Sequence, residues 1–364
     1  MRMRKEKDFI SFFNGKTGYY VRTGIIENGK DTGKDPFMSS FPELLDVGVM
    51  GHCKHGKNGL CIKAGVECYQ DGLHSNNPNM TIEDFRKIAE QCKGQTYQFA
   101  LGGCGDPDQH EHFEELLKIC KENNIVPNFT TSGLGMTVEI ANLCKEYCGA
   151  VAVSWYRSDY TIKAINTLTN SGVKTNIHYV LSKYTIEEAL IRLKEQSFPK
   201  GINAIVFLLH KPVGLGSYQA VLTKEDVKEF ISYVTKGNPQ YKIGFDSCTV
   251  PALLHDLGNI QLESLDTCEG ARWSAYVTPN MKMLPCSFDN QEQKWAVDLK
   301  KYSIKEAWYS NKFEEFRDYF RNSCPTCIKR DTCLGGCPIR EEIVLCEKKN
   351  KILVNCKSDN RKGE

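Results

Sequence analysis

Residues 44–53 read LLDVGVMGHC, a mostly apolar run that ends at a glycine, a histidine and Cys53. Cys61 follows after seven residues and Cys68 after six more, and Tyr69 comes directly after Cys68. Three thiolates in one loop at the carboxyl end of a strand can hold three irons of a cubane cluster and leave the fourth iron free for a substrate. A zinc site or buried cysteines are the alternatives. Zinc loops usually contain a Cys-x2-Cys pair, which this loop lacks, but the loop alone does not decide between these readings.

Short apolar runs alternate with amphipathic helical segments from residue 44 to about residue 212. This alternation is expected of successive βα units around a parallel sheet. The predicted strands are residues 44–50, 96–103, 126–132, 150–156, 174–181, 204–210 and 242–246. The predicted helix starts are Thr81, Thr137, Thr185 and Thr223. Six βα units in a row predict an α/β fold, a partial (β/α)6 barrel whose working face lies at the carboxyl ends of its strands.

The composition excludes several classes of protein. With 364 residues, 41% of them hydrophobic, the chain can form one large domain and a smaller one, which excludes disorder. Its formal net charge of +2 gives no whole-chain sign of binding to nucleic acid or to an anionic membrane, and no apolar stretch is long enough for a signal peptide or a membrane span. We therefore expect a cytoplasmic protein whose seventeen cysteines are metal ligands, catalytic groups or core residues and not a disulfide scaffold. Four of them fall in helical step with apolar neighbours and are expected in the core: Cys92, Cys120, Cys144 and Cys148.

A second group of cysteines lies near the end of the chain, at Cys324, Cys327, Cys333 and Cys337. The prolines and glycines among them exclude a helical core stripe and predict loops around metal, for which zinc and iron–sulfur are equally suitable from the residues alone. The alternation of predicted strands and helices stops after about residue 248. Between the barrel and this group of cysteines, the sequence instead predicts a hairpin at 272–287 and one amphipathic helix at 303–320. These features predict a small cysteine-rich α+β domain after the barrel.

The second predicted strand ends in a glycine run, residues 102–107, which lets the backbone approach a ligand at the same edge of the sheet. Together with the three-cysteine loop, this run resembles the radical S-adenosylmethionine (radical SAM) superfamily. The resemblance implies a [4Fe–4S] cluster on Cys53, Cys61 and Cys68. The implied contacts to the bound S-adenosylmethionine (SAM) are Tyr69, Gly102, Gly103, Cys104, Asp106, Ser154 and Asn176.

Two features depart from the usual radical SAM pattern. The usual spacing is Cys-x3-Cys-x2-Cys, whereas this loop is Cys-x7-Cys-x6-Cys. Cys104 stands where an acidic residue is usual, and we expect it to be a free thiol beside the cofactor, with a cluster ligand as the alternative.

The spacing of the second group, Cys-x2-Cys-x5-Cys-x3-Cys, resembles the SPASM extension of peptide-modifying radical SAM enzymes, in which two auxiliary clusters share the ligands. The implied ligands of one cluster are Cys268, Cys286 and Cys337, with Cys248 as a candidate fourth, and those of the other are Cys324, Cys327, Cys333 and Cys356. Cys356 is preferred over Cys346 by its spacing. The usual glycine five residues before Cys286 is Met281 here, so we expect the hairpin turn to depend on Asn280.

These inferences predict four parts: an N-terminal extension at residues 1–43, a radical SAM barrel at 44–247, a SPASM-type domain at 248–356 and a polar tail at 357–364. The resemblance implies an enzyme that reductively cleaves SAM to a 5′-deoxyadenosyl radical and takes hydrogen from a substrate, with an electron donor such as a flavodoxin or ferredoxin. The extension favours a peptide or protein side chain as the substrate. A small molecule or an RNA nucleoside is the alternative substrate, and a non-catalytic, zinc-stabilised binding module is the alternative of another class. Asp106, Glu111 and Asp246 are all candidates for a catalytic base.

Overall fold

A computed structural model describes residues 1–346, and a ten-stranded sheet forms its centre, in the order β12-β11-β10-β9-β8-β7-β6-β13-β14-β15. Strands β6 to β12 run parallel, and their bounds are Leu44–Met50, Gln98–Gly103, Val126–Thr131, Val151–Ser154, Thr175–Leu181, Ala204–Leu209 and Ile243–Phe245. All seven strands predicted from the sequence are therefore confirmed, with ends that differ by at most two residues.

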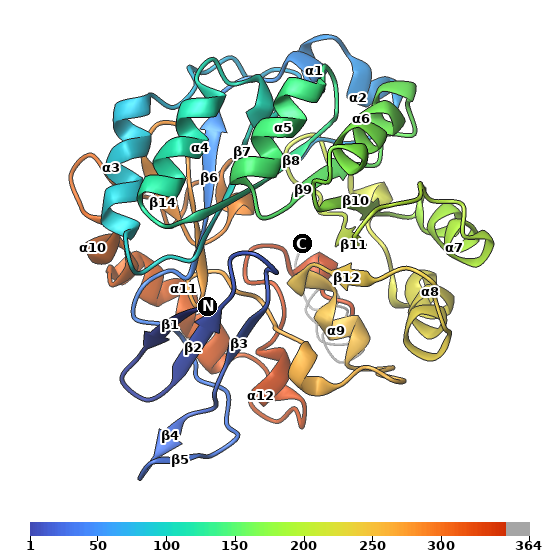
Figure 1. The fold of residues 1–364 in the computed structure, drawn as a ribbon. Coiled ribbons are helices and arrows are strands. Elements are labelled where there is room, and N and C mark those ends of the chain that lie inside the picture. Colours follow the sequence, from blue (N-terminus) through green and yellow to red (C-terminus); the bar gives the residue numbers. More distant parts are fainter. Residues whose placement is uncertain (347–364) are drawn as a thin grey trace, which may run out of the picture.

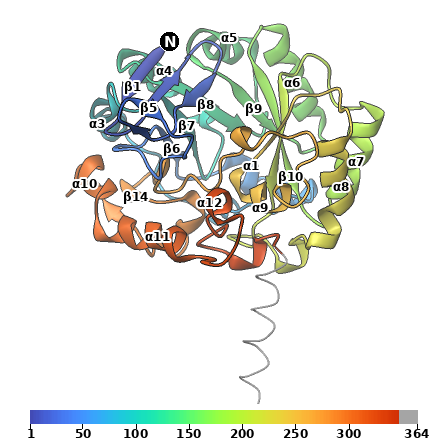
Figure 2. The same cartoon turned by 90° about the horizontal axis from the view of Figure 1, so that it is seen from below.

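Helices connect these strands and cover the outer face of the sheet. The long ones are α3 (Ile82–Cys92), α4 (Phe113–Glu122), α5 (Val138–Tyr147), α6 (Asp159–Asn170), α7 (Ile186–Glu195) and α8 (Lys224–Lys236). Seen from below, they form an arc outside the strands, and the C-terminal elements lie across the open side (Figures 1 and 2). Two short helices, α1 (Lys54–Lys57) and α2 (Leu60–Lys63), lie in the loop after β6. This is the predicted partial (β/α)6 barrel.

The helices begin where the sequence predicts. Thr81, Thr137 and Thr223 each accept a hydrogen bond from a backbone N–H of the first helical turn, and Thr223 forms a capping box with Asp226. Thr185 also precedes its helix, but its hydroxyl donates to the carbonyl of Val180 at 2.7 Å. Three of the four threonines thus mark helix starts because their side chains satisfy backbone N–H groups that the helix leaves unpaired.

The C-terminal hairpin belongs to the sheet of the barrel. Strands β13 (Ser274–Val277), β14 (Lys282–Leu284) and β15 (Val297–Asp298) extend the sheet beyond β6, and β13 pairs with β6 in parallel. In the turn, Met281 has a left-handed backbone with φ +66° and is buried. Methionine itself thus adopts the left-handed conformation that the usual glycine would take, and Asn280 contributes to the turn by accepting a hydrogen bond from the hydroxyl of Thr278 at 2.5 Å.

The predicted single helix at 303–320 is also wrong, because the structure has two helices there, α10 (Ile304–Trp308) and α11 (Asn311–Asn322). Each begins at its own serine cap. Ser303 forms a capping box with Glu306, and Ser310 accepts a hydrogen bond from the N–H of Phe313. The second cap ends the first helix after barely more than one turn, although the apolar spacing continues. Two further short helices are α9 (Val250–Leu253) and α12 (Arg330–Cys333).

The first forty-three residues form strands that the sequence reading did not find. The antiparallel sheet of this region has three strands, β1 (Arg2–Lys5), β2 (Ile10–Phe13) and β3 (Tyr20–Arg22), and a small hairpin follows from β4 (Ile26–Glu27) and β5 (Lys30–Asp31).

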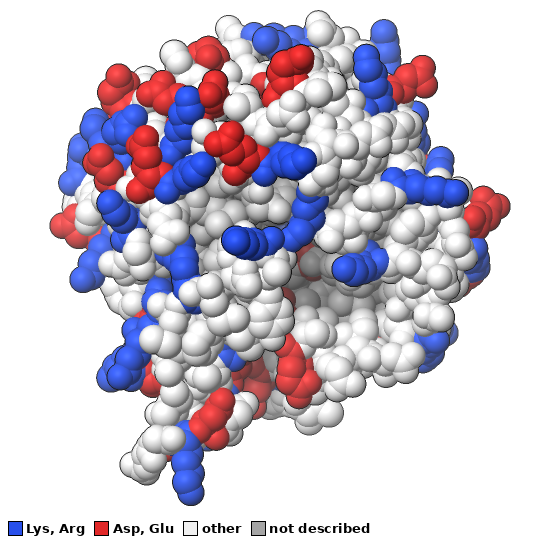
Figure 3. All heavy atoms as spheres, viewed as in Figure 1, with Lys and Arg blue, Asp and Glu red and all other residues white. Residues whose placement is uncertain are grey.

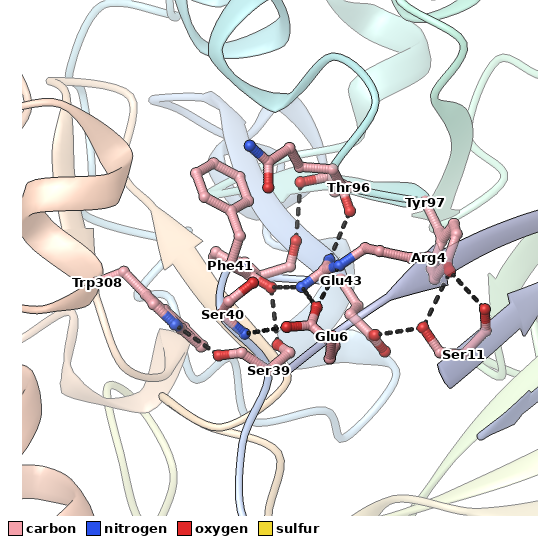
Figure 4. Close-up of polar contacts among 12 residues, drawn as sticks. Arg4, Glu6, Ser11, Ser39, Ser40, Phe41, Glu43, Thr96, Tyr97 and Trp308 are labelled. Atoms are coloured by element: carbon pink, nitrogen blue, oxygen red, sulfur yellow. Dashed lines mark hydrogen bonds and ion pairs between the residues drawn. The ribbon is translucent and has the colours of Figure 1, made fainter. Parts of the chain in front are cut away.

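Buried Arg4 ties this sheet to the barrel, as Figure 4 shows. Its guanidinium donates to Glu6 at 2.6 Å and to the carbonyls of Gln95 at 2.6 Å and Phe41 at 2.8 Å. Glu43 completes the junction by accepting a hydrogen bond from Ser11 at 2.8 Å. The extension is thus packed against the amino-terminal ends of β6 and β7.

The surface in Figure 3 is hollowed near its centre, with Lys and Arg side chains along the upper edge of the hollow and Asp or Glu side chains at its lower edge. Charges of both signs therefore border the hollow, in keeping with a nearly neutral chain. Among residues 1–346, no helix has the length and apolar character that crossing a membrane requires.

Candidate functional site

The three cysteines of the first loop lie together at the carboxyl end of β6. The Sγ of Cys53 accepts the N–H of Gly56 at 3.1 Å, and the Sγ of Cys68 accepts the N–H of Gly72 at 3.4 Å. Burial raises the pKa of Cys53 to about 12 and also raises that of Cys68, and the charges of neighbouring thiols add to both shifts, Cys68 acting on Cys53 and Cys61 acting on Cys68. The loop therefore gathers three thiols and directs backbone N–H groups at two of them, an arrangement suited to holding thiolates on a metal.

Gly102 and Gly103 end β7 beside this loop. A Cβ added to Gly102 would meet no atom within 4 Å, whereas a Cβ on Gly103, at φ +105°, would lie 2.3 Å from the carbonyl oxygen of Met50. Gly102 thus leaves open space for a ligand, and Gly103 lets β7 approach β6 closely. The predicted glycine run is therefore placed at the edge of the sheet where the cysteine loop begins.

Cys104 is buried next to the cysteine loop. Its thiol contacts the carbonyl of Gln70 at 3.4 Å, and burial raises its pKa to about 11. The charge of Cys68 contributes to this rise, which shows that the two thiols are neighbours. Tyr69 faces the C-terminal part of the chain, where its ring lies 4.8 Å from that of Phe288. The roles of Cys104 and Tyr69 toward a cofactor stay predictions.

The three candidate bases all have partners. Asp106 is buried and accepts hydrogen bonds from the backbone N–H of Ser132 at 2.7 Å and from its hydroxyl at 2.5 Å, so it joins the glycine loop to the end of β8. Asp246 accepts from the ammonium of Lys211 at 2.5 Å. Glu111 accepts from the amide of Asn79 at 2.7 Å. These contacts give each carboxylate a structural role.

Ser154 and Asn176 do not lie at the same level of the sheet. The register pairs Ser154 with His178, and it pairs Asn176 with Ala152, two residues nearer the amino-terminal end of the strands. Two residues correspond to about 7 Å along a strand. Asn176 bonds there to the side chain of Asn203 at 2.8 Å. The structure therefore places His178, and not Asn176, beside Ser154.

The four cysteines predicted for the first auxiliary cluster come together from distant parts of the chain: Cys248, Cys268, Cys286 and Cys337. Burial raises the pKa of Cys268 to about 12 and raises those of Cys248 and Cys286 well above the usual value. The charge of Cys337 adds to all three shifts. Cys248, the candidate fourth ligand by sequence, therefore lies near Cys268 and Cys337, and its role as a ligand stays a prediction. Such buried thiols lose their protons when they bind a metal.

The other four cysteines line a single mostly apolar cavity of about 170 Å³: Cys324, Cys327, Cys333 and Cys346. Burial raises the pKa of Cys333, and the charges of the other three add to the rise. Cys356, which spacing favoured over Cys346, lies outside the described residues. Within the described part of the chain, the fourth position of this group is taken by Cys346.

The geometry of these groups differs from that of a mononuclear site. Within residues 1–346, no three His, Cys, Asp or Glu side chains converge closely enough to hold a single metal ion. In a cubane cluster each thiolate binds a different iron, so its ligands stand farther apart than those of tetrahedral zinc. Three thiols in the first group and four in each of the other two are donor sets that iron–sulfur clusters take. The predicted core cysteines lie elsewhere: Cys92, Cys120 and Cys144 are buried and Cys148 is half-buried against the core.

Three residues near these groups were not found by sequence reasoning. His178 faces Ser154, and burial lowers its pKa to about 4. Lys211 is buried beside Cys248; burial alone would lower its pKa, but Asp246 raises it. Tyr276 is buried on β13. Lys211 comes directly after a predicted strand, which places it at the carboxyl edge of the barrel. That position was a signal from which Lys211 could have been predicted as a site residue.

The chain is similar to one known protein family and to several solved structures. Residues 268–330 match the SPASM family, described as an iron-sulfur cluster-binding domain. The fold is similar to that of SuiB from Streptococcus suis, with a TM-score of 0.68 and 14% sequence identity over 96% of this chain and 98% of that one. It is also similar to SuiB bound to its precursor peptide SuiA, with a TM-score of 0.64 and 16% identity over 86% of this chain and 76% of that one.

A third solved structure, native anSMEcpe with bound AdoMet and the Cp18Cys peptide, matches with a TM-score of 0.59 and 16% identity over 88% of this chain and 100% of that one. At these identities the likeness concerns the fold. The predicted α/β partial-barrel fold is thereby confirmed, and residues 268–330 match the SPASM family as the cysteine spacing predicted.

Proposed function

From the premise of a radical SAM fold with a SPASM region, we propose that this protein is a radical SAM enzyme that modifies a peptide or protein side chain. The observation that carries this proposal is the arrangement of eleven cysteines in three groups, one on the loop after β6 and two in the C-terminal part. A zinc-stabilised binding module would not need three such groups around a barrel edge.

The residues of the first loop would hold a [4Fe–4S] cluster through Cys53, Cys61 and Cys68. When bound there with SAM, the cluster supplies a 5′-deoxyadenosyl radical by one-electron reduction. The N–H groups of Gly56 and Gly72 stabilise the thiolate form of two ligands, and Gly102 leaves space for the SAM molecule. Ser154 and His178 offer polar groups at the neighbouring strand ends.

The two C-terminal groups would hold auxiliary clusters in the part of the chain from residue 248 onward. One uses Cys248, Cys268, Cys286 and Cys337, and the other uses Cys324, Cys327 and Cys333. For its fourth ligand we propose Cys346, since it lines the same cavity. Cys356 is the alternative on spacing. Electrons would come from a flavodoxin or ferredoxin.

The choice of a peptide as substrate rests on solved structures of the same fold. SuiB has been solved with the precursor peptide SuiA, and anSMEcpe with the Cp18Cys peptide. Fold alone serves many reactions, so this support is by analogy.

Metal analysis and product formation test the proposal together. Protein purified without oxygen should contain about eight to twelve irons per chain with equal sulfide and no zinc. With dithionite and SAM it should form 5′-deoxyadenosine. Cys53→Ala should abolish this product, whereas Cys148→Ala, at a half-buried cysteine outside the three groups, should retain it. Zinc without sulfide, and no deoxyadenosine, would contradict the proposal.

The same assay separates the two candidates for the last ligand. Cys346→Ala should lower the iron content by up to four per chain if Cys346 is a ligand, and Cys356→Ala should then leave it unchanged. The reverse result would assign the site to Cys356.

A further inference from the structure

A buried lysine lies beside the first auxiliary group, the name we give to the four cysteines Cys248, Cys268, Cys286 and Cys337. Lys211 follows the end of β11 by two residues and is 7% exposed. Its ammonium contacts the carboxylate of Asp246 at 2.5 Å and donates to the carbonyl of Leu209 at 2.9 Å. Asp246 in turn accepts the N–H of Leu209 at 3.1 Å. The ion pair therefore joins the ends of the neighbouring strands β11 and β12.

The ammonium of this lysine contacts two of the segments that carry the cysteines. Its partner Asp246 precedes Cys248 by two residues, and the same carboxylate accepts a hydrogen bond from the hydroxyl of Thr249 at 2.8 Å. On the other side, the ammonium lies 4.5 Å from the centre of the Phe288 ring, and Phe288 follows Cys286 by two residues. The positive charge is thus held between the segment of Cys248 and the segment of Cys286.

The positive charge of Lys211 acts on the nearby thiols more strongly than the negative charge of its partner does. Burial raises the pKa of Cys248, Lys211 lowers it, and Asp246 raises it by less than Lys211 lowers it. Burial alone would lower the pKa of Lys211, but the charges of Asp246, Cys248 and Cys337 raise it, so the lysine keeps its proton at neutral pH. The first auxiliary group therefore faces a net positive influence from this ion pair.

Stability alone is a weak reason to bury a lysine at this place. In a buried ion pair, the cost of removing two charges from water offsets most of the attraction between them, so apolar residues of similar size are often at least as stable. Four thiolates in one buried site give a cation a different use, because they repel one another and repel any electron added among them. The reduction potential of an iron–sulfur cluster depends on such charges and on burial.

We propose that Lys211 is a fixed counter-charge that raises the reduction potential of the cluster held by the first auxiliary group. This inference rests on the proposed function, which places a cluster there, and adds how the protein makes that cluster reducible. Reduction adds one electron and no proton, so the site becomes more negative by one elementary charge. A nearby cation stabilises the reduced form more than the oxidised form, and Asp246 opposes this effect. Lys211 itself takes no part in the cleavage of SAM.

The test measures this potential in the full chain purified without oxygen. The protein is titrated with dithionite in the presence of redox mediators, and its clusters are followed by electron paramagnetic resonance. The signal that Cys268→Ala removes belongs to the first auxiliary group. Lys211→Gln keeps a hydrogen-bond donor but loses the charge. We expect it to lower the equilibrium constant for reduction of this cluster about tenfold, which is about 59 mV for one electron.

Two further variants separate the charge of Lys211 from the structural role of the ion pair. Asp246→Asn keeps the lysine and removes the opposing charge, so the potential should shift upward. Lys211→Arg keeps the cation and should shift the potential by less than half as much as Lys211→Gln does. Lys163→Gln, at an exposed lysine on α6, is the matched control and should leave the potential unchanged. A purely structural role of the pair would not move the potential in opposite directions.

Several results would overturn the inference: an unchanged potential in Lys211→Gln, shifts of the same sign in Lys211→Gln and Asp246→Asn, or an arginine variant that shifts as far as the glutamine variant. If Lys211→Gln loses iron, the upward shift in Asp246→Asn decides, and its absence contradicts the inference. The readout does not depend on catalysis. Protein that shows these shifts but forms no deoxyadenosine would disprove the proposed function and leave this inference standing. Deoxyadenosine without the shifts would disprove this inference alone.

Discussion

Asp46 lies on β6, between Ala100 of β7 and Tyr276 of β13 in the sheet register. Burial raises its pKa to about 7, whereas an aspartate in an unfolded chain has a pKa near 3.9. Between these two values the folded protein holds a proton that the unfolded chain has lost. The free energy of unfolding contributed by Asp46 therefore falls as pH rises from about 4 to 7.

The fall in unfolding free energy with rising pH gives a prediction for Asp46→Asn. Relative to this variant, the unmodified protein should lose about 2 to 3 kcal/mol of unfolding free energy between pH 5 and 8, since each pKa unit is worth about 1.4 kcal/mol. Urea unfolding at several pH values measures the difference. Glu83→Gln, on the exposed side of α3, is the control and should give a curve parallel to that of the unmodified protein. Parallel curves for Asp46→Asn would show that the carboxyl group is hydrated in solution.

At the scale of elements, a buried cation helps to fasten the N-terminal strands to the barrel. Arg4 is 9% exposed and joins β1 to Glu6 and to backbone carbonyls at the base of the barrel (Figure 4). Surface ion pairs contribute little to stability, but removing one partner of a buried pair leaves an uncompensated charge. Arg4 is the buried cation of this attachment, which it shares with Arg2, a donor to the carbonyl of Thr96 at 3.1 Å, and with Ser11.

We expect Arg4→Met to lower the free energy of unfolding by about 3 to 5 kcal/mol, because Glu6 is left buried without its partner. Lys5→Met, at the adjacent exposed position of the same strand, should change it by less than about 0.5 kcal/mol. Chemical unfolding measures both, and limited proteolysis should show earlier cleavage within the first forty-three residues of the Arg4 variant only. Equal effects of the two substitutions would contradict the anchoring role.

Considered as a whole, the molecule has one sheet that runs through both of its proposed main parts. Strand β13 pairs with β6 over four residues, Ser274 to Val277 against Leu44 to Val47, so the hairpin is hydrogen-bonded to the first barrel strand. Cys268 and Cys286, which flank the hairpin, and the first cysteine loop are therefore attached to neighbouring strands of one sheet.

Hydrogen exchange tests this continuity. The amides of β13 should be protected to within about tenfold of those of β6, because the two strands can open only together. The small β4–β5 hairpin, which lies outside the main sheet, should exchange much faster and provides an internal control. Exchange of β13 at the rate of β4–β5 would show that the C-terminal part opens independently of the barrel.

The sequence by itself determined the order of the barrel elements and the cysteines of the first loop. Each strand and helix start depends on residues close together in the chain, such as the apolar run at 44–50 and the capping box of Thr223, so local patterning was sufficient. It did not determine where one helix ends and the next begins, because Ser310 interrupts an apolar spacing that continues through it.

Only the tertiary structure decided which distant residues meet. Sheet register, and not spacing, places His178 beside Ser154 and leaves Asn176 nearer the other end of the barrel. In the same way, the approach of chain segments far apart in sequence brings Cys248 to Cys337, and sets Gln70 beside Tyr276. These contacts depend on how strands pair and pack across the whole molecule, which no short window of sequence contains.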